Sequence, residues 1–445
     1  MMDIKQFEYK PLAHYSYAIV SDGKMAVIDP ERDPKQYYDY AKAKNATIVA
    51  IIETHPHADF VSSHLEIHQK TGATIYNSEK LGADYPHTSF DDNDHIILGK
   101  IRLSAINTPG HSPDSITVVA TEGEKTALFT GDTLFIGDVG RPDLREKAGN
   151  TTAKRLELAE MMFHTIQTKF TALPDDALVY PAHGAGSLCG KNLSEANSST
   201  LGNERMGNWA FKENSKQDFI NTLLDSQPFI PSYFGYDVDL NKSGAPNLIP
   251  ALEEVPFNAR TEASGLIVDI RAKEDFKKGY LKGSINIQAV SEEDKFETWL
   301  GAIIMPKEAF TLVIDQAKNR YKLLHRVAKI GYEKQLKQVI TLADGNLEKS
   351  ATLDLADFRK HPEKYTIVDI RNKSEVEEGK IFKSAISHPL NELRTTAQDI
   401  PTDRPIVVHC AGGYRSAAGS SVLQQILTGP IIYDLSDDVK GFIQK

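Results

Sequence analysis

The sequence predicts a mixed α/β protein with three domains. Its length of 445 residues corresponds to about three domains at roughly 150 residues each. Short β-branched strands alternate with helical stretches, and residues 256–445 contain an internal repeat. Apolar residues make up 40% and charged residues 25%, which is typical of a folded globular protein rather than a disordered or fibrous one.

Short strands dominate the first 250 residues. The predicted strands are Tyr17 to Val20, Met25 to Ile28, Ile48 to Ile52, Ile101 to Ile106, Ile116 to Val119 and Ala127 to Phe129. Helices are expected over 152–167 and 215–225. The Pro-, Gly- and Asn-rich stretch from Gln227 to Pro250 is interpreted as a connection, which places a domain boundary near residue 255.

The internal repeat lies in the C-terminal part of the chain. Residues 267–286 and 367–386 share eight of twenty positions, and both begin with I-V-D-I-R. Each copy continues with a charged helical stretch, a Gly turn, a second apolar strand (Phe310 to Ile314, Ile406 to Val408) and a helix. This order predicts two small α/β modules with parallel sheets. We therefore expect domains at 1–255, 256–346 and 347–445.

The charge balance and the first residues of the chain indicate which partners and which compartment to expect. The net charge of −10 is spread without a long run of one sign, which argues against a nucleic-acid or membrane surface. The start lacks an apolar stretch of signal-peptide length, so we expect a cytoplasmic protein. Two cysteines, Cys189 and Cys410, are too few for a disulfide framework.

Histidines and aspartates follow four apolar strands of the first domain. The segment T-H-P-H-A-D-F supplies His55, His57 and Asp59, and later segments supply His111 (T-P-G-H), Asp132 (F-T-G-D) and His183 (Y-P-A-H). One such histidine would more often be a core or surface residue. Because the pieces recur in order at strand ends, they predict a divalent transition-metal site.

This order of motifs resembles the metallo-β-lactamase fold, an αββα sandwich with its metal site at the strand edge. More narrowly, T-H-P-H-A-D-F, T-P-G-H-S-P-D-S, G-D-T-L-F-I-G-D-V-G-R-P-D-L and H-G-A-G-S-L-C-G-K resemble persulfide dioxygenases fused to rhodanese domains, which act in sulfide detoxification. The resemblance covers essentially the whole chain.

The resemblance implies one Fe(II) per chain, held by His55, His111 and Asp132. Two histidines and one carboxylate leave positions open for O2 and a substrate sulfur. It also implies that His57, Asp59 and His183 orient ligands and water or stay idle. The fold's commoner pattern has a histidine where this chain has Phe60, and the loss of that ligand argues against a two-zinc site.

For two further residues of the first domain, the sequence leaves two possible roles. Arg141 in G-R-P-D is a candidate for binding the anionic substrate or sulfite, and an ordinary salt bridge is the alternative. Cys189 lies in a glycine-rich turn near the metal edge. It is either a sulfur relay or, as we favour, a packed structural thiol.

A thiol loop follows the strand I-V-V-H in the second repeat copy. In C-A-G-G-Y-R-S, Cys410 heads a Gly-rich turn that leads into a helix, where backbone N–H groups and the helix dipole stabilise a thiolate. Four residues separate Cys410 from Arg415, one fewer than in cysteine phosphatases. The copy therefore resembles a rhodanese, with Cys410 catalytic and Gly412, Gly413 and Arg415 binding substrate.

The first copy has no such thiol. Asp315 stands about where Cys410 would fall, and the glycines of the loop are absent. A carboxylate cannot carry a persulfide, so residues 256–346 resemble a catalytically inactive rhodanese with a role in spacing, docking or oligomer contact.

These features together predict an iron enzyme that oxidises a low-molecular-weight thiol persulfide with O2 to sulfite. Its rhodanese domain would link persulfide and thiosulfate, and we expect a homo-oligomer with small-molecule partners. The alternative is a two-zinc thioester hydrolase of the glyoxalase II type. A non-enzymatic redox-sensing scaffold would explain Cys410 but not the six metal-type residues.

Overall fold

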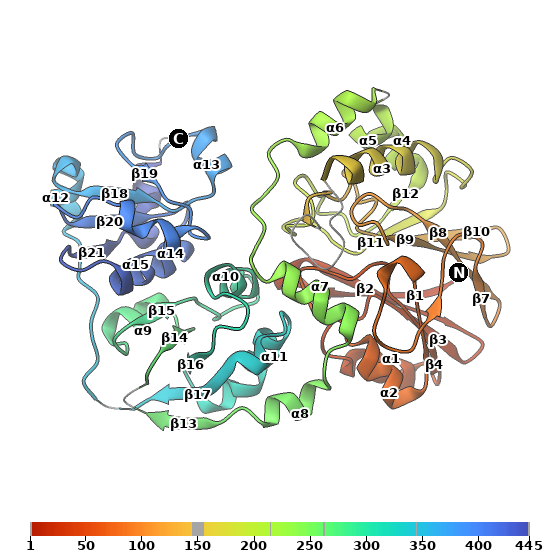
Figure 1. Ribbon diagram of the computed structural model, residues 1–445, viewed down its shortest axis with the longest axis horizontal. Coiled ribbons are helices and arrows are strands. Elements are labelled where there is room, and N and C mark those ends of the chain that lie inside the picture. Colours follow the sequence, from red (N-terminus) through yellow and green to blue (C-terminus); the bar gives the residue numbers. More distant parts are fainter. Residues whose placement is uncertain (1, 145–154, 214, 261–262, 344, 444–445) are drawn as a thin grey trace. The chain divides into compact units, whose positions relative to one another are not determined.

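The computed structural model describes residues 2–144, 155–213, 215–260, 263–343 and 345–443. The chain forms two compact units (Figure 1). The first comprises Met1–Ala251 together with Ala328–Gly331, and the second comprises Leu252–Val327 and Tyr332–Lys445.

Two six-stranded sheets form the centre of the first unit. The first sheet has the order β1-β2-β3-β4-β5-β6, with β1 Asp3–Tyr9, β2 His14–Ser21, β3 Lys24–Ile28, β4 Thr47–Ile52, β5 Thr74–Asn77 and β6 Thr88–Ser89. The second has the order β12-β11-β10-β9-β8-β7, with β7 His95–Leu98, β8 Ile101–Asn107, β9 Ile116–Glu122, β10 Lys125–Gly131, β11 Leu178–Pro181 and β12 Ser199–Thr200. All six strands predicted for this region are confirmed.

Alternating side chains of the central strands supply two different cores. In β2, Tyr17 and Ile19 join the core between the sheets, whereas Ala18 faces the helices on the outside. In β4, Ile52 points inward and Ile51 outward in the same way. The strands are therefore apolar on both faces, because a strand with a period of two must bury both sides in a four-layer fold.

Helices cover the outer faces of both sheets (Figure 1). On the first sheet, α1 (Lys35–Ala43) contributes Tyr37 and Ala41, and α2 (His64–Thr71) contributes Ile67. The second sheet packs against α3 (Arg155–Thr168), α5 (Trp209–Lys212) and α6 (Lys216–Leu224), with α4 (Leu201–Gly207) alongside. The αββα sandwich and the two helices are confirmed, although 152–154 lie outside the described residues.

The interpretation of Gln227 to Pro250 as a mere connection is wrong. This stretch contains α7 (Phe234–Ser243) and the start of α8 (Leu248–Glu253). Helix α7 forms because Phe234, Val238 and Asn241 recur at helical spacing and are buried together on one face. The surrounding Pro, Gly and Asn residues concealed this short pattern.

The second unit contains two parallel sheets, one from each repeat copy. The first sheet has the order β13-β17-β16-β14-β15, formed by Phe257–Arg260, Leu336–Leu342, Phe310–Ile314, Leu266–Asp269 and Ser284–Asn286. The second has the order β19-β18-β20-β21, formed by Ile386–Ser387, Thr366–Asp369, Ile406–His409 and Ile432–Asp434. The helices are α9 (Lys273–Lys278), α10 (Phe296–Ile303), α11 (Arg320–Ala328), α12 (Leu355–Lys360), α13 (Lys373–Glu378), α14 (Leu393–Thr396) and α15 (Tyr414–Ile426).

The two copies share one topology around their central strands. In each copy the I-V-D strand (β14 or β18) lies between its two parallel neighbours, so the chain turns to opposite sides of it. Ligands bind α/β sheets at such points, outside the carboxyl ends of the strands. Cys410 follows β20 at this edge, and Asp315 follows β16. No helix within the described part of the chain is long and apolar enough to span a membrane.

Candidate metal centre and thiol loop

The six predicted metal-type residues meet at one end of the sandwich. His55, His57 and Asp59 follow β4 of the first sheet, whereas His111, Asp132 and His183 follow β8, β10 and β11 of the second. All six side chains are buried. Gly131, with φ of 52°, brings β10 against Thr54, since a Cβ there would lie 2.5 Å from Thr54 Oγ1.

Two of the histidines approach the same carboxylate oxygen. Nε2 of His55 lies 3.7 Å from Oδ2 of Asp132, and Nε2 of His111 lies 3.6 Å from the same oxygen. Within the described residues, His55 Nε2 and Asp132 Oδ2 are buried without a hydrogen-bond partner. Since unpartnered buried polar atoms are costly, the His55 nitrogen and the Asp132 oxygen, with the His111 nitrogen close to the same oxygen, fit a bound metal ion.

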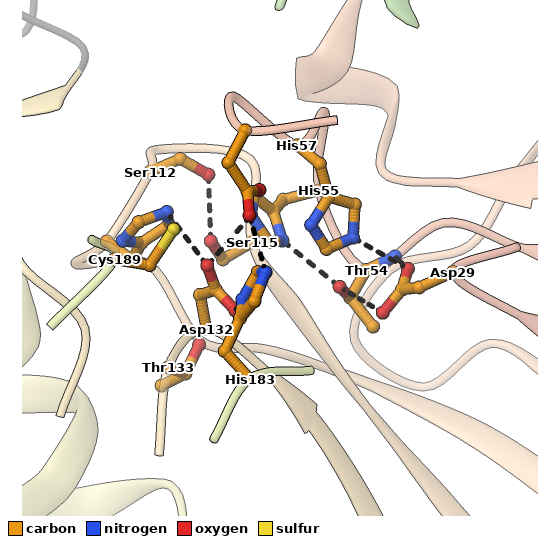
Figure 2. Close-up of polar contacts among 12 residues, drawn as sticks. Asp29, Thr54, His55, His57, Ser112, Ser115, Asp132, Thr133, His183 and Cys189 are labelled. Atoms are coloured by element: carbon orange, nitrogen blue, oxygen red, sulfur yellow. Dashed lines mark hydrogen bonds and ion pairs between the residues drawn. The ribbon is translucent and has the colours of Figure 1, made fainter. Parts of the chain in front are cut away.

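Hydrogen bonds on the far side of these residues support the same arrangement. Nδ1 of His111 lies 2.9 Å from the main-chain oxygen of Arg141, which can only accept, so the proton is on Nδ1 and the lone pair on Nε2. Nδ1 of His183 lies 2.7 Å from Oδ1 of Asp132, which leaves Oδ2 free (Figure 2). A metal-ligating histidine or carboxylate typically has such a partner.

The electrostatics keep the three groups in the forms that bind metals. Burial, together with the neighbouring His57, lowers the pKa of His55 well below 6.5, and burial also lowers the pKa of His111. Burial opposes ionisation of Asp132, but the charge and hydrogen bond of His183 hold its pKa well below its usual range. Neutral imidazoles and an ionised carboxylate are the ligand forms required.

His57 belongs to two groups in this region whose potential ligand atoms lie within 4.8 Å of one another, one with His55 and Asp132 and a second group with Asp59 and His183. His183 contacts carboxylates through both ring nitrogens, since its Nε2 lies 2.8 Å from Oδ2 of Asp59. Burial disfavours the imidazolium, yet Asp132 and Asp59 raise the pKa of His183 well above 6.5. A protonated histidine has no lone pair for a metal.

Phe60 packs against this second group. Its ring is fully buried, with its centroid 4.4 Å from that of His57 and 3.8 Å from that of His14. His14 was not predicted as part of the site. It starts β2 and reaches the centre through a β-bridge to His183, a contact that no local motif indicates.

Other supporting residues also escaped the sequence analysis. Asn241 of α7 donates Nδ2–H bonds of 2.8 Å to the main-chain oxygens of His57 and Phe60, and its Oδ1 accepts from the Ser62 N–H. Asp29 and Thr54 contact the histidines from the other side (Figure 2). Asn241 is 184 residues from His57, so only the fold reveals this contact.

The two residues with open roles lie beside the centre. The guanidinium of Arg141 is buried and makes a two-bond ion pair with Asp143 (2.6 and 2.7 Å) and a bond to the Leu188 carbonyl. These contacts fit the salt-bridge alternative. Cys189 is buried with its sulfur near Asp132 and His183, and burial together with the charge of Asp59 raises its pKa well above 9. That pKa matches the packed-thiol alternative.

The thiol loop, which begins at Cys410, places a main-chain N–H group against the sulfur. Cys410 directly follows β20, and its sulfur accepts the N–H of Gly413 at 3.1 Å. Gly413 has φ of 95°, and a Cβ there would lie 2.6 Å from the Ser436 main chain. A Cβ at Gly412 would meet no atom within 4 Å other than those of its chain neighbours. Arg415 forms a two-bond ion pair with Glu375 (2.6 and 2.7 Å).

The Cys-less copy touches this loop within the second unit. Tyr414 donates its hydroxyl to the Gln288 carbonyl at 2.8 Å, and the Arg415 guanidinium lies 5.8 Å from the centre of the Trp299 ring. In that copy, Asp315 accepts from Asn319 at 3.0 Å and lines a pocket of about 220 Å³. The equivalence of Asp315 and Cys410 in the two folds is confirmed.

Comparisons with known proteins agree with this architecture. Residues 9–183 match the Metallo-beta-lactamase superfamily, and residues 256–348 and 354–445 each match the Rhodanese-like domain. A solved structure described as a metallo-beta-lactamase from Staphylococcus aureus subsp. aureus COL is 34% identical, with a TM-score of 0.70, and the match covers 77% of this chain and 99% of that one.

Two curated relatives match part of the chain. The cytoplasmic hydroxyacylglutathione hydrolase of Arabidopsis thaliana is 32% identical, and the mitochondrial persulfide dioxygenase ETHE1 of Bos taurus is 26% identical. Each match covers 38% of this chain, and 63% and 62% of the respective relative. The chain therefore belongs to the metallo-beta-lactamase superfamily and carries two rhodanese-like domains.

Proposed function

We propose that this protein is a non-haem iron persulfide dioxygenase coupled to a sulfurtransferase. Residues 1–255 would oxidise the outer sulfur of a low-molecular-weight thiol persulfide to sulfite. Residues 347–445 would form the catalytic rhodanese domain, and residues 256–346 a Cys-less one that supports it. The relatives at low identity include both a persulfide dioxygenase and a thioester hydrolase, so the argument depends on the site.

The approach of His55 Nε2 and of His111 Nε2 to Asp132 Oδ2, at 3.7 and 3.6 Å, is the observation that carries the proposal. Two histidines and one carboxylate on one side of a metal are typical of Fe(II) enzymes that use O2, because the other positions stay open. When bound there, Fe(II) would supply the site where O2 and the persulfide sulfur meet. One persulfide, one O2 and one water give a thiol, a sulfite and two protons.

Phe60 and His183, which lie around these ligands, would determine how many metal ions the centre binds. Phe60 offers no ligand atom, and His183 is engaged by Asp132 and Asp59. His183 would thereby hold the Asp132 carboxylate with one oxygen facing the metal. This arrangement favours one iron over two zinc ions.

The thiol loop would carry the second step. The Cys410 thiolate attacks the outer sulfur of a persulfide and releases the thiol, which leaves a persulfide on Cys410. Sulfite then attacks that outer sulfur with its lone pair, forms thiosulfate and regenerates the thiolate. The N–H of Gly413 donates to the sulfur and would stabilise its anionic forms. Arg415 would attract sulfite only with the part of its charge that its ion pair with Glu375 leaves uncompensated.

A two-zinc hydrolase of the glyoxalase II type is the second candidate. The grouping of His57, Asp59 and His183 favours it, since these residues could hold a second metal after His183 loses its proton. Two zinc ions held there would supply a hydrolytic nucleophile for a thioester carbonyl.

Oxygen uptake separates the two candidates. The iron-loaded protein should consume O2 when supplied with glutathione persulfide or coenzyme A persulfide and should release sulfite. The zinc-loaded protein should not hydrolyse an acyl-glutathione thioester. Thioester turnover without O2 uptake would overturn the proposal.

A further inference from the structure

Asp29 lies behind the two histidines of the H-x-H segment. It directly follows β3, is fully buried and has φ of 50°, a conformation that Asp and Asn tolerate better than other residues with a side chain. Its main-chain N–H donates to the Ile52 carbonyl at 3.0 Å, which fixes it beside the end of β4. The carboxylate therefore faces the loop that begins with Thr54.

One oxygen of this carboxylate faces His57. Nε2 of His57 lies 3.3 Å from Oδ1 of Asp29, which also accepts the Thr54 N–H at 2.7 Å. The neighbouring carboxylate of Glu53 has other partners, since its Oε1 accepts the Ser62 hydroxyl at 2.7 Å and lies 3.4 Å from Nδ1 of His64. Asp29 thus contacts the His57 ring at ion-pair distance, and Glu53 belongs to the same group of potential ligand atoms within 4.8 Å.

The other oxygen acts on His55 through Thr54. Oγ1 of Thr54 lies 2.8 Å from Oδ2 of Asp29 and 3.1 Å from Nδ1 of His55. A hydroxyl has a single proton, and the carboxylate can only accept it, so the hydroxyl must accept from His55. His55 then carries its proton on Nδ1, and the lone pair of Nε2 points toward Asp132 Oδ2.

We propose that Asp29 is the positioning residue of this centre, which orients both imidazoles of the H-x-H segment and, through Thr54, selects the His55 tautomer that can bind a metal. The inference rests on His55 as a metal ligand and is independent of whether the metal is iron or zinc. Outer hydrogen-bond partners of this kind typically change metal affinity by about 10- to 100-fold.

The test measures Zn(II) affinity of the full-length apoprotein by competition with a chromophoric chelator. Asp29→Asn keeps the size and tolerates the backbone conformation, whereas Thr54→Val removes only the hydroxyl link to His55. Both should bind Zn(II) about 10- to 100-fold more weakly. Thr54→Ser should restore affinity to within about threefold, because its hydroxyl can make both hydrogen bonds.

Asp138→Asn is the matched control. Asp138 is also a buried carboxylate, but it accepts from Trp209 Nε1 and from the main-chain N–H groups of Val139 and Asn192. This variant should keep wild-type Zn(II) affinity even if it unfolds at a lower temperature. If Asp29→Asn fails to fold, the comparison of Thr54→Val with Thr54→Ser decides.

Nitrogen-15 NMR of the apoprotein with labelled histidine gives a readout of the tautomer itself. In the wild type, the His55 signal, assigned with His55→Gln, should show the proton on Nδ1, and Thr54→Val should shift the population toward Nε2–H. A wild-type His55 protonated on Nε2, or wild-type Zn(II) affinity in both Asp29→Asn and Thr54→Val, would overturn the inference. Failure of O2 uptake would count against the proposed function alone, since Zn(II) binding does not depend on it.

Discussion

The imidazole of His183 bridges two carboxylates, with Nδ1 2.7 Å from Asp132 Oδ1 and Nε2 2.8 Å from Asp59 Oδ2. This bridge joins the two halves of the centre, because Asp59 follows a strand of the first sheet and Asp132 a strand of the second. It also engages the histidine that a second metal would need. The proposal of a single metal rests on this bridge and leads to specific expectations.

Removing any one of the three proposed ligands should abolish both iron binding and O2 uptake. Alanine at His55, His111 or Asp132 should lower both bound iron and O2 uptake to a few per cent of wild type or less, because two ligands hold Fe(II) too weakly. Metal analysis and oxygen-electrode assays on the same samples check this. The surface variant His361→Ala should keep both properties, and an alanine variant with full iron and no activity would remove that residue from the ligand set.

Phe60 should decide whether a second metal can enter. In Phe60→His, a new imidazole would stand beside His57, and zinc content at saturation should rise from one toward two per chain. Phe60→Leu is the matched control and should stay at one. A value of one in both variants would mean that the His183 bridge, rather than Phe60, excludes the second metal.

Sulfur transfer should depend on Cys410 alone. Cys410→Ser should abolish thiosulfate-linked transfer and leave O2 uptake on a supplied persulfide largely intact, because a hydroxyl cannot carry the sulfur. Asp315→Ala in the Cys-less copy should change neither rate beyond the error of measurement. Transfer that persists in Cys410→Ser and disappears in Cys189→Ser would assign the step to Cys189.

Gly413 should be essential to the loop, whereas Gly412 should tolerate a methyl group. Gly413→Ala combines a φ of 95° with a Cβ 2.6 Å from the Ser436 main chain, which should cost about 1–3 kcal/mol of stability and displace the N–H from the sulfur. Gly412→Ala should unfold at the wild-type temperature. Thermal unfolding and sulfurtransfer assays compare the two, and equal behaviour would contradict the role of Gly413 as the loop's fixed donor.

Local patterns made much of the fold and of the site predictable. The strand before T-H-P-H-A-D-F is apolar on both faces, so it indicated a buried strand whose end carries the histidines. Asp315 was matched to Cys410 because the repeat preserves the strand that precedes each of them. These inferences need only the residues next to each motif.

The contacts that support the site could not be predicted from the sequence, and the reason is physical. Asp29 is 25 residues from Thr54, and Asn241 is more than 180 residues from the loop that it holds. Neither lies in a motif, since a carboxylate or an amide gains its role only from the atoms that the fold brings to it. Arg141 illustrates the same limit, because Asp143 and the Leu188 carbonyl decide its role and only the structure shows their geometry.

Metal content of the wild type and of His183→Ala, both purified without added metal, tests the central claim most directly. The proposed dioxygenase has its single metal on His55, His111 and Asp132, so both proteins should contain about one iron per chain, with O2 uptake reduced in the variant because the Asp132 carboxylate is less well held. Two zinc ions in the wild type, falling to one in His183→Ala, would contradict the account and establish His183 as a ligand of a two-metal hydrolase.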